Sequence, residues 1–468
     1  MISLMHLKEC PSVLSLPKTI NFEEKLGFCS DSRKYIHPSF FVAIPGQKVN
    51  PLDVIENLLN KKCPLVIYED NYENKIKVEK LQRIHPQTAF ITVTNSITFL
   101  QEISHLHIVE WKQMNVRNAI FAISGSNGKT THKEMLGHIL NSIKPNKIII
   151  TEKNNNNHLG VPLTLLQVSQ STELVVLELG SNHPGEIKVL CDIAVPTAGL
   201  TTNIGATHLE FFGTEEKVFE EEGYLYHAVK NVTNGNGFYL INNDDNYLRN
   251  LKPFAGCVTF AEKADAQAKV TYVDNGAQIV YNSKTLSISN KNVTGKHNKL
   301  NLITCVFIAH HFFPEKQSEI LLAATKFQPT KNRSEWIEFE GVPIYLDAYN
   351  ANPSSMKAAL EGFKQSVIEK NMTLNEACIV LGDMNELGEL TAQYHQEVAQ
   401  FAEKLGFINV YFIGRYSSHY ANGFSQGQTR GSTTEFKNEY RNNVLKKYRI
   451  HFIKGSRSLQ LESLFDIT

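Results

Sequence analysis

The sequence predicts an α/β protein of three domains, in which the central domain contains a largely parallel, doubly wound sheet. Three observations lead to this prediction. The chain of 468 residues is too long for one ordinary hydrophobic core. Short apolar runs alternate with helical patterns through most of the chain, which is typical of parallel sheets covered by helices. One of the strand–helix junctions carries a glycine-rich turn at residues 125–131.

The composition excludes several classes of protein. Lys+Arg and Asp+Glu are equal at 47 each, so no net field attracts nucleic acid or anionic lipid. The seven cysteines are scattered singly, without zinc spacing, which favours a reducing compartment over a disulfide framework. The N-terminal stretch has no continuous apolar region, and no segment reaches the length of a membrane span. We therefore expect a cytoplasmic protein that neither binds nucleic acid nor spans a membrane.

The glycine-rich turn has the features of a phosphate-binding loop. It follows an apolar run at Ala119–Ile123 and precedes a helical pattern. Its residues are Gly125, Ser126, Asn127, Gly128, Lys129, Thr130 and Thr131. Backbone N–H groups and a helix N-terminus point at an anion in such a turn, while the lysine reaches the outer phosphates and the following hydroxyl can ligate Mg²⁺. The turn departs from the generic pattern at Ile123, where a glycine is usual.

Residues 1–105 form the first predicted domain, a small α/β unit. Apolar runs at Phe40–Ile44, Pro64–Tyr68 and Ala89–Val93 predict its strands. The preceding turn contains Ser32 and Arg33, which either form a surface turn or offer a hydroxyl and a guanidinium to a ligand.

Residues 106–325 form the second predicted domain, which contains the phosphate loop. Its further strands are predicted at Lys147–Thr151, Leu174–Leu177, Thr197–Thr201 and Gly237–Ile241. Ligands bind beyond the carboxyl ends of such strands, where Glu178 and His208 lie. With the Thr130 hydroxyl nearby, Glu178 is a predicted Mg²⁺ ligand, although a strand-end Glu can also pair with a surface cation. His208 is either a second ligand or a polar residue at the end of a loop.

Two amide-rich turns in this domain are further candidates. Asn154–Asn157 could hydrogen-bond a polar ligand or be simple low complexity. Asn298 precedes a helix predicted at Asn301–Ala309, and could contact a base edge or cap that helix.

Residues 326–468 form the third predicted domain, again α/β. Its strands are predicted at Val342–Asp347, Ala377–Leu381, Asn409–Ile413 and Tyr448–Ile453, and its helices at Ser355–Ile368, Thr391–Leu405 and Glu435–Lys447. The alternation predicts a Rossmann-like sheet, with a turn-rich segment at Asp347–Pro353.

Several strings resemble the Mur ligase superfamily, the ATP-dependent amide-forming enzymes of peptidoglycan precursor synthesis. In chain order they include SDSR, AISGSNGKTT, TEKNNNNHLGVPLTLL, ELGSNHPGEI, TTNIGATHLEFFG, GKHN, NRS, LDAYNANPSSM and LGDMNELG. The last two resemble the branch that adds D-alanyl-D-alanine to UDP-N-acetylmuramoyl-tripeptide, the MurF type.

The resemblance implies a role for each domain. The first would bind the UDP part of the substrate, the second ATP with Mg²⁺, and the third D-alanyl-D-alanine, in an enzyme that is usually a monomer. ATP would convert the tripeptide carboxylate to an acyl phosphate, which the dipeptide amine then attacks. Lys129, Glu178 and His208 would be catalytic; Asn298, Arg333 and Asp347 would contact ATP; Ser32, Arg33, Asn157, Asn350 and Asn352 would contact the other substrates.

The main departure from the family pattern is at one position, and a smaller one is at GQKVNPLDVI, where the family usually has a glycine-bearing turn. The family carries a lysine in a Lys-Gly-Glu triplet, normally carbamylated to a metal ligand, where this chain has Glu222 followed by Gly223 and Tyr224. A Glu side chain is shorter than a carbamylated lysine by roughly 3–4 Å, so a water would have to bridge Glu222 to a metal. Either the enzyme is active with Glu222 as that ligand, or the chain is a divergent paralogue that binds nucleotide without efficient ligation. Another superfamily ligase, similar to folylpolyglutamate synthase, is a third alternative.

Overall fold

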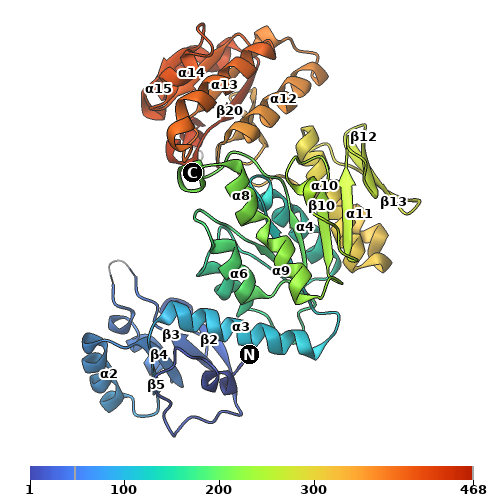
Figure 1. The fold of residues 1–468 in the computed structure, drawn as a ribbon. Coiled ribbons are helices and arrows are strands. Elements are labelled where there is room, and N and C mark those ends of the chain that lie inside the picture. The colour runs from blue at the N-terminus through green and yellow to red at the C-terminus, as the bar shows by residue number, and fades with distance from the viewer. Residues whose placement is uncertain (47–48, 466–468) are drawn as a thin grey trace.

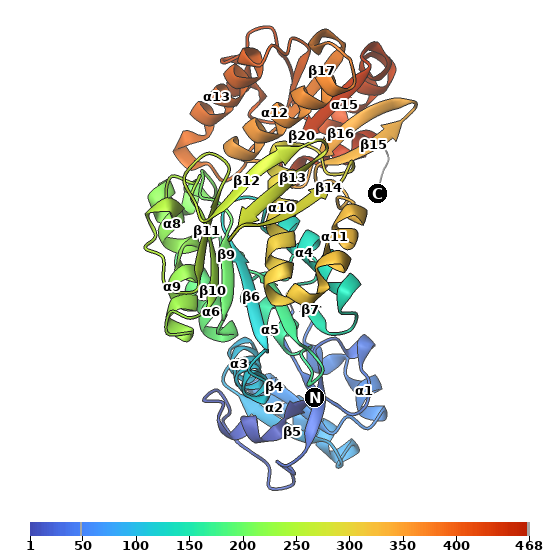
Figure 2. The ribbon, with the colours of Figure 1, turned by 90° about the vertical axis from the view of Figure 1, so that its right-hand side faces the viewer.

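Three lobes follow one another along the molecule, each built on its own sheet (Figures 1 and 2). The computed structural model describes residues 1–46 and 49–465. The sheets have five, nine and six strands in chain order. The predicted three-domain α/β architecture is confirmed.

The N-terminal sheet has the strand order β1-β2-β3-β4-β5, and all pairs except β1–β2 are parallel. Its strands are β1 (Ile2–Ser3), β2 (Lys25–Cys29), β3 (Ser39–Val42), β4 (Leu65–Glu69) and β5 (Ala89–Val93). The helices are α1 (Glu56–Asn60), α2 (Tyr72–Ile84) and α3 (Ser96–Met114). Strand β3 is buried along its whole length, as expected for a parallel strand covered on both faces.

Helix α3 joins the N-terminal lobe to the central one. It begins at the cap Asn95, whose side chain accepts hydrogen bonds from the N–H groups of Ile97 and Thr98. Its first half packs into the N-terminal core through Ile103, and its second half packs into the central core through Trp111. The predicted domain boundary at residue 105 therefore falls inside a continuous helix.

The central sheet has the order β14-β13-β12-β11-β10-β9-β6-β8-β7. Its strands are β6 (Ala119–Ser124), β7 (Ile148–Ile150), β8 (Leu174–Glu178), β9 (Ala198–Thr201), β10 (Phe238–Asn242), β11 (Cys257–Ala261), β12 (Ala268–Val273), β13 (Gly276–Tyr281) and β14 (Lys284–Ser289). All pairs from β7 to β12 are parallel, which confirms the doubly wound sheet.

Helices cover both faces of this sheet (Figure 2). Those of the central lobe are α4 (Lys129–Ile143), α5 (Gly160–Leu165), α6 (Glu186–Ala194), α7 (Leu209–Phe212), α8 (Glu215–Glu222), α9 (Tyr224–Val232), α10 (Lys296–Phe312) and α11 (Gln317–Lys326). Helices α4, α10 and α11 pack on one face, and α5, α6 and α9 pack with the end of α3 on the other.

Strands β11 to β14 of the central sheet were not predicted from the sequence. The strands β12, β13 and β14 form antiparallel pairs at the edge of the sheet. In β14 exposed and buried residues alternate, which is the pattern of a strand with one solvated face and lacks the continuous apolar run used to predict the others.

The C-terminal sheet has the order β15-β16-β20-β17-β18-β19, with only the β15–β16 pair antiparallel. Its strands are β15 (Glu335–Phe339), β16 (Val342–Asp347), β17 (Ala377–Gly382), β18 (Val410–Ile413), β19 (Gln428–Arg430) and β20 (Ile450–Lys454). Its helices are α12 (Pro353–Glu369), α13 (Thr391–Lys404), α14 (Ser417–Ala421) and α15 (Thr433–Glu439). This is the predicted Rossmann-like domain.

Two predicted helices differ from the observed ones. The helix expected from Asn301 begins five residues earlier, at Lys296, directly after Gly295. The single helix expected over Glu435–Lys447 is α15 followed by a π-turn at Tyr440–Val444 and a 3₁₀ turn. Among the described residues, no helix combines the length and apolar character that a bilayer crossing requires.

Candidate active site

The phosphate loop lies between β6 and α4, as predicted. Gly125 and Gly128 have φ angles of +117° and +81°, which residues with a Cβ rarely adopt. A Cβ on Gly125 would also lie 2.3 Å from the hydroxyl oxygen of Thr202, so the close approach of the residue after β9 requires glycine there. The Ser126 N–H donates to the carbonyl of Asn203 at 2.8 Å, which fixes the loop to the segment after β9.

A buried histidine hydrogen-bonds the backbone of the loop. His132 lies in the first turn of α4, and its Nδ1 lies 2.9 Å from the Gly128 carbonyl, to which it donates. Burial lowers the pKa of His132 to about 4. The ring therefore stays neutral near pH 7 and adds no charge beside the loop.

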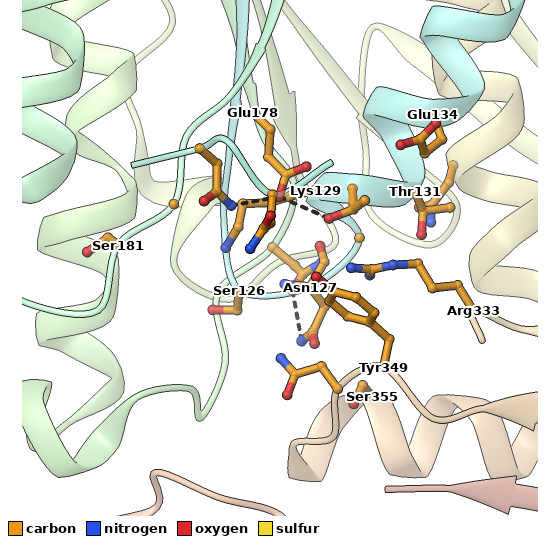
Figure 3. Close-up of a pocket in the computed structure, with 18 of the residues that line it drawn as sticks. Ser126, Asn127, Lys129, Thr131, Glu134, Glu178, Ser181, Arg333, Tyr349 and Ser355 are labelled. Atoms are coloured by element: carbon orange, nitrogen blue, oxygen red, sulfur yellow. Dashed lines mark hydrogen bonds between the residues drawn. The ribbon is translucent and has the colours of Figure 1, made fainter. Parts of the chain in front are cut away.

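A cavity of about 1000 Å³ lies between this loop and the C-terminal domain (Figure 3). Its walls come from the central domain, through the loop, the asparagine-rich turn and the ends of β8 and β9, and from the C-terminal domain. Thirteen predicted site residues line it: Ser126, Asn127, Gly128, Lys129, Thr130, Thr131, Asn157, Glu178, His208, Asn298, Arg333, Asp347 and Asn350. Residues far apart in the sequence thus meet at one site.

Thr130 and Glu178 form the part of the site that fits a metal ion. The Thr130 hydroxyl and the Nδ2 of Asn156 donate to Oε1 of Glu178 at 2.9 and 3.0 Å. The other oxygen, Oε2, is buried without a hydrogen bond, and the ammonium of Lys133 lies 3.8 Å from it. A hydroxyl and an unsatisfied carboxylate oxygen beside a phosphate loop match the oxygen donors that Mg²⁺ prefers. In residues 1–46 and 49–465 no three His, Cys, Asp or Glu side chains gather as a metal site, so phosphate or water oxygens would complete the coordination.

His208, predicted as a second metal ligand, has a carboxylate partner from the other domain. Its Nδ1 lies 2.5 Å from Oε2 of Glu386. The adjacent His208 ring lowers the pKa of Glu386. His208 has a left-handed backbone (φ 51°) and lies just ahead of α7. The ring therefore joins the central and C-terminal domains at the edge of the cavity, and its role toward a metal stays a prediction.

Glu222 has partners other than the predicted bridging water and metal. Its Oε2 accepts a hydrogen bond from the Gly125 N–H at 2.7 Å, and its Oε1 lies 3.3 Å from Nζ of Lys129. Its side chain is not part of the cavity lining. Both oxygens of this carboxylate therefore contact residues of the phosphate loop.

Arg333 and Asp347 line the C-terminal side of the cavity. The Arg333 guanidinium stacks on the ring of Tyr349, 3.7 Å from its centroid, and projects into the cavity (Figure 3). Asp347, at the end of β16, pairs with the buried Lys454 at 2.6 Å. Lys454 also donates to the carbonyl of Asn350 at 2.9 Å. These contacts fix the turn after β16 that faces the phosphate loop.

Asn352 joins the two domains rather than lining the cavity. Its side chain caps α12 in a capping box with Ser355, and Pro353 occupies the first turn. Its Nδ2 also donates to Oδ1 of Asn127 in the phosphate loop at 2.6 Å. The Nδ2 of Asn127 in turn donates to the hydroxyl of Ser354 at 2.9 Å.

The side chains of two predicted site residues, Asn298 and Asn157, hydrogen-bond the backbone of their own helix ends. The Nδ2 of Asn298 donates to the Thr294 carbonyl at 3.1 Å, within the first turn of α10. Oδ1 of Asn157 accepts from the Gly160 N–H at 2.9 Å at the start of α5. Both still line the cavity, so contacts with a ligand remain predictions for them.

Ser32 and Arg33 lie in the N-terminal lobe and are not among the residues that line the cavity. The Arg33 side chain is 87% exposed and pairs with Asp31 at 2.8 Å. The turn is therefore a surface turn in this structure, and its role in substrate binding stays a prediction.

Lys133 and Ser354 are two residues of the site that the sequence analysis did not single out, whereas Asn156 lies in the asparagine-rich turn named there. Lys133 and Asn156 contact Glu178, and Ser354 contacts the loop. A signal existed for Lys133, because its place four residues after Lys129 on α4 puts it on the same face of the helix. The contact of Ser354 depends on domain packing, which no local pattern encodes.

A doubly wound domain with a phosphate loop, facing a Rossmann-like domain across one cavity, defines a nucleotide-dependent enzyme of several domains. Residues 123–309 match the family model of the Mur ligase middle domain, and residues 332–441 match that of the Mur ligase glutamate ligase domain. The chain belongs to the Mur ligase family, and is an ATP-dependent ligase of that family.

Curated relatives match most of the chain. A protein of Bacillus subtilis is 28% identical over 384 residues, which is 79% of this chain and 76% of the relative. One of Rickettsia prowazekii is 28% identical over 449 residues, or 91% of each chain. Both are named UDP-N-acetylmuramoyl-tripeptide--D-alanyl-D-alanine ligase.

Solved structures share the fold over nearly the full length. A crystal structure of MurF from Acinetobacter baumannii has a TM-score of 0.79 at 23% identity and covers 99% of this chain and 98% of that one. MurF ligase from Thermotoga maritima in complex with ADP has a TM-score of 0.74 at 21% identity, with 94% and 96% covered.

Proposed function

We propose that the protein joins D-alanyl-D-alanine to UDP-N-acetylmuramoyl-tripeptide at the expense of ATP, as a step of peptidoglycan precursor synthesis. The observation that carries the proposal is the single cavity in which the phosphate loop faces Arg333, Asp347 and Asn350 of the C-terminal domain. Membership of the Mur ligase family and the names of relatives over most of the chain support this choice of substrates.

The loop positions the phosphates of ATP. Its backbone N–H groups and the N-terminus of α4 face the anion, and Lys129 leaves Glu222 to reach the outer phosphates. Thr130 and Glu178 are the residues that would hold Mg²⁺, which neutralises phosphate charge when bound. Arg333, on its aromatic support Tyr349, supplies a second cation from the opposite wall.

The chemistry requires positioning and exclusion of water. A carboxylate does not react with an amine until one of its oxygens becomes a good leaving group. Attack of that oxygen on the γ-phosphorus expels ADP and gives an acyl phosphate. The dipeptide amine then attacks the acyl carbon and phosphate leaves, with loss of a proton from nitrogen. The contacts of Asn352 and Ser354 with Asn127 hold the C-terminal domain over the loop, which keeps water from the acyl phosphate.

The remaining assignments belong to the same proposal. The N-terminal lobe would bind the UDP moiety through Ser32 and Arg33, and the C-terminal domain would bind the dipeptide near Asn350 and Asn352. The seven free and buried cysteines support a cytoplasmic location. We propose that the protein acts as a monomer on these small molecules.

A phosphate-release assay tests the proposal. The protein is mixed with UDP-N-acetylmuramoyl-tripeptide, ATP, Mg²⁺ and D-alanyl-D-alanine, and a Lys129→Met variant serves as the inactive control. We expect phosphate release that needs both substrates. Turnover only with glutamate and a folate would identify a folylpolyglutamate synthase-like ligase, and nucleotide binding without turnover on either pair would identify a divergent paralogue.

A further inference from the structure

Glu222 stands where the family pattern has a lysine, and the structure gives its side chain a defined set of contacts. It is the last residue of α8 and is only 2% exposed. One carboxylate oxygen accepts the Gly125 N–H at 2.7 Å, and the other lies 3.3 Å from the Lys129 ammonium. Lys129 also donates to the carbonyl of Gly125. The carboxylate thus contacts the first glycine and the lysine of the phosphate loop.

The backbone of Glu222 is fixed as firmly as its side chain. Its carbonyl accepts hydrogen bonds from the hydroxyl of Ser124 at 2.8 Å and from that of Thr201 at 3.3 Å. These residues end β6 and β9, the two strands that flank the loop. Because these hydrogen bonds fix the backbone of Glu222, its carboxylate is held in a defined position against the loop.

The same contacts separate Glu222 from the groups that fit a metal. Thr130 and Glu178 line the cavity, whereas Glu222 does not. Glu178 keeps a buried oxygen without a hydrogen bond, whereas both oxygens of Glu222 have partners within the loop. Of these two carboxylates, only Glu178 has an oxygen without a hydrogen bond.

We propose that Glu222 is a positioning residue of the phosphate loop, which acts without a metal and without carbamylation by CO₂. It fixes the Gly125 N–H and holds Lys129 against the loop in the free protein. Bound phosphates compete for Lys129 and draw it away from the carboxylate. The inference rests on the proposed function only in that the loop binds a nucleotide.

Substitutions separate the two parts of this role. Glu222→Gln keeps an acceptor for the Gly125 N–H but removes the charge that holds Lys129 and repels phosphate. We expect it to bind ADP about three- to tenfold more tightly than the wild type in the absence of metal, where tenfold corresponds to about 1.4 kcal/mol. Glu222→Ala also leaves the buried Gly125 N–H without a partner, so it should bind ADP more weakly than Glu222→Gln.

Calorimetric titration of the full chain with ADP, in EDTA and again in excess Mg²⁺, measures these affinities. A metal ligand would give the opposite pattern, with Glu222→Gln unchanged in EDTA and weaker only in Mg²⁺. That result overturns the proposal, as does failure of both the wild type and Glu222→Gln to bind ADP in EDTA. Because no ligation is needed, the titration can succeed even if the proposed peptide substrates are wrong.

Two neighbouring glutamates of α8 provide matched controls. Glu220 is exposed and pairs with Lys217, so Glu220→Gln removes the same charge away from the loop. Glu221 is buried and accepts from the Gly185 and Ile187 N–H groups at the start of α6. Glu221→Gln should lower the melting temperature, whereas both controls should leave the affinity for ADP in EDTA unchanged. A tighter complex in either control would refute a specific role of Glu222.

A bicarbonate titration at low pH tests the independence from CO₂. Phosphate release by the wild type should not respond to bicarbonate. In Glu222→Lys, which restores the lysine of the family, any activity should rise with bicarbonate. A strong bicarbonate requirement of the wild type would contradict the proposal.

Discussion

Replacement of Lys133 by methionine tests the electrostatics beneath the predicted metal site. Lys133 is 1% exposed, and its ammonium lies 2.9 Å from the Lys153 carbonyl and 2.8 Å from a carboxylate oxygen of Glu134. It is also the cation 3.8 Å from the buried, unpaired oxygen of Glu178. Methionine fills a similar volume but removes the charge and the donors.

The expected cost follows from these contacts. A hydrogen bond from a charged group contributes about 1.5–3 kcal/mol, and removal of one partner of a buried ion pair costs about 3–5 kcal/mol. Thr130 and Asn156 still hydrogen-bond the other oxygen of Glu178, so we expect a loss near the lower limit, about 3 kcal/mol. For a domain of this size that loss corresponds to a decrease of about 6–12 °C in melting temperature.

Differential scanning calorimetry with and without saturating Mg²⁺ and ADP measures the effect. Bound Mg²⁺ would replace the missing positive charge beside Glu178, so the destabilisation should shrink when both ligands are present. Lys188→Met is the control, because Lys188 is exposed and pairs with Asp192 on α6, where about 0–1 kcal/mol is expected. A loss below about 1 kcal/mol for Lys133→Met, or equal losses with and without ligands, would refute the reasoning.

Three further predictions concern the loop, the domain contact and pH. Gly125→Ala should abolish ADP binding in a calorimetric titration, because the new Cβ would lie 2.3 Å from the Thr202 hydroxyl. Gly213→Ala is the control and should bind ADP normally, because no atom lies within 4 Å of the new Cβ although φ is +78° there. Asn352→Asp keeps the cap of α12 but loses the donor to Asn127, so it should raise KM for ATP with little change in Tm. Asn352→Ala loses the cap as well and should also lose about 1 kcal/mol of stability. Equal Tm values for the two variants would contradict the assignment of the cap and the domain contact to different atoms of Asn352. The free energy of unfolding, measured by urea titration, should fall as the pH drops from about 6.5 to about 4, because buried histidines with a pKa lowered to about 4 bind protons only in the unfolded chain. These residues are His132, His395 and His451. Each contributes at most about 1.4 kcal/mol per pH unit within that window, and stability that stays constant there would show that the rings are protonated in the folded state.

Local patterns predicted the fold better than they predicted contacts between distant residues. The apolar run of β6 and the glycines after it fix the phosphate loop by local geometry, and Glu178 follows from its place at the end of the adjacent strand. Strands β12 to β14 were missed because their solvated face breaks the apolar run. The pairing of His208 with Glu386 joins segments 178 positions apart, which no periodicity can reveal.

Glu222 shows that the contacts of a side chain can remain unpredicted even where its position in a family motif is known. Alignment with the family motif located the position and its change of residue type. The shorter side chain, compared with a carbamylated lysine, led to the prediction of a water between Glu222 and a metal. The structure directs the carboxylate to the Gly125 N–H and Lys129 instead. The direction of a side chain depends on how the helix that carries it packs, and sequence spacing does not contain that information.

The hydrogen bonds of Asn127 have a consequence for inhibitor design. One side chain of the phosphate loop contacts both Asn352 and Ser354 of the C-terminal domain. A nucleotide mimic confined to the loop would meet only features that many P-loop proteins share. A compound extended past the outer phosphate position toward Ser354 would meet side chains that a P-loop protein without such a domain cannot offer. Selectivity would therefore come from the half of the cavity opposite the loop.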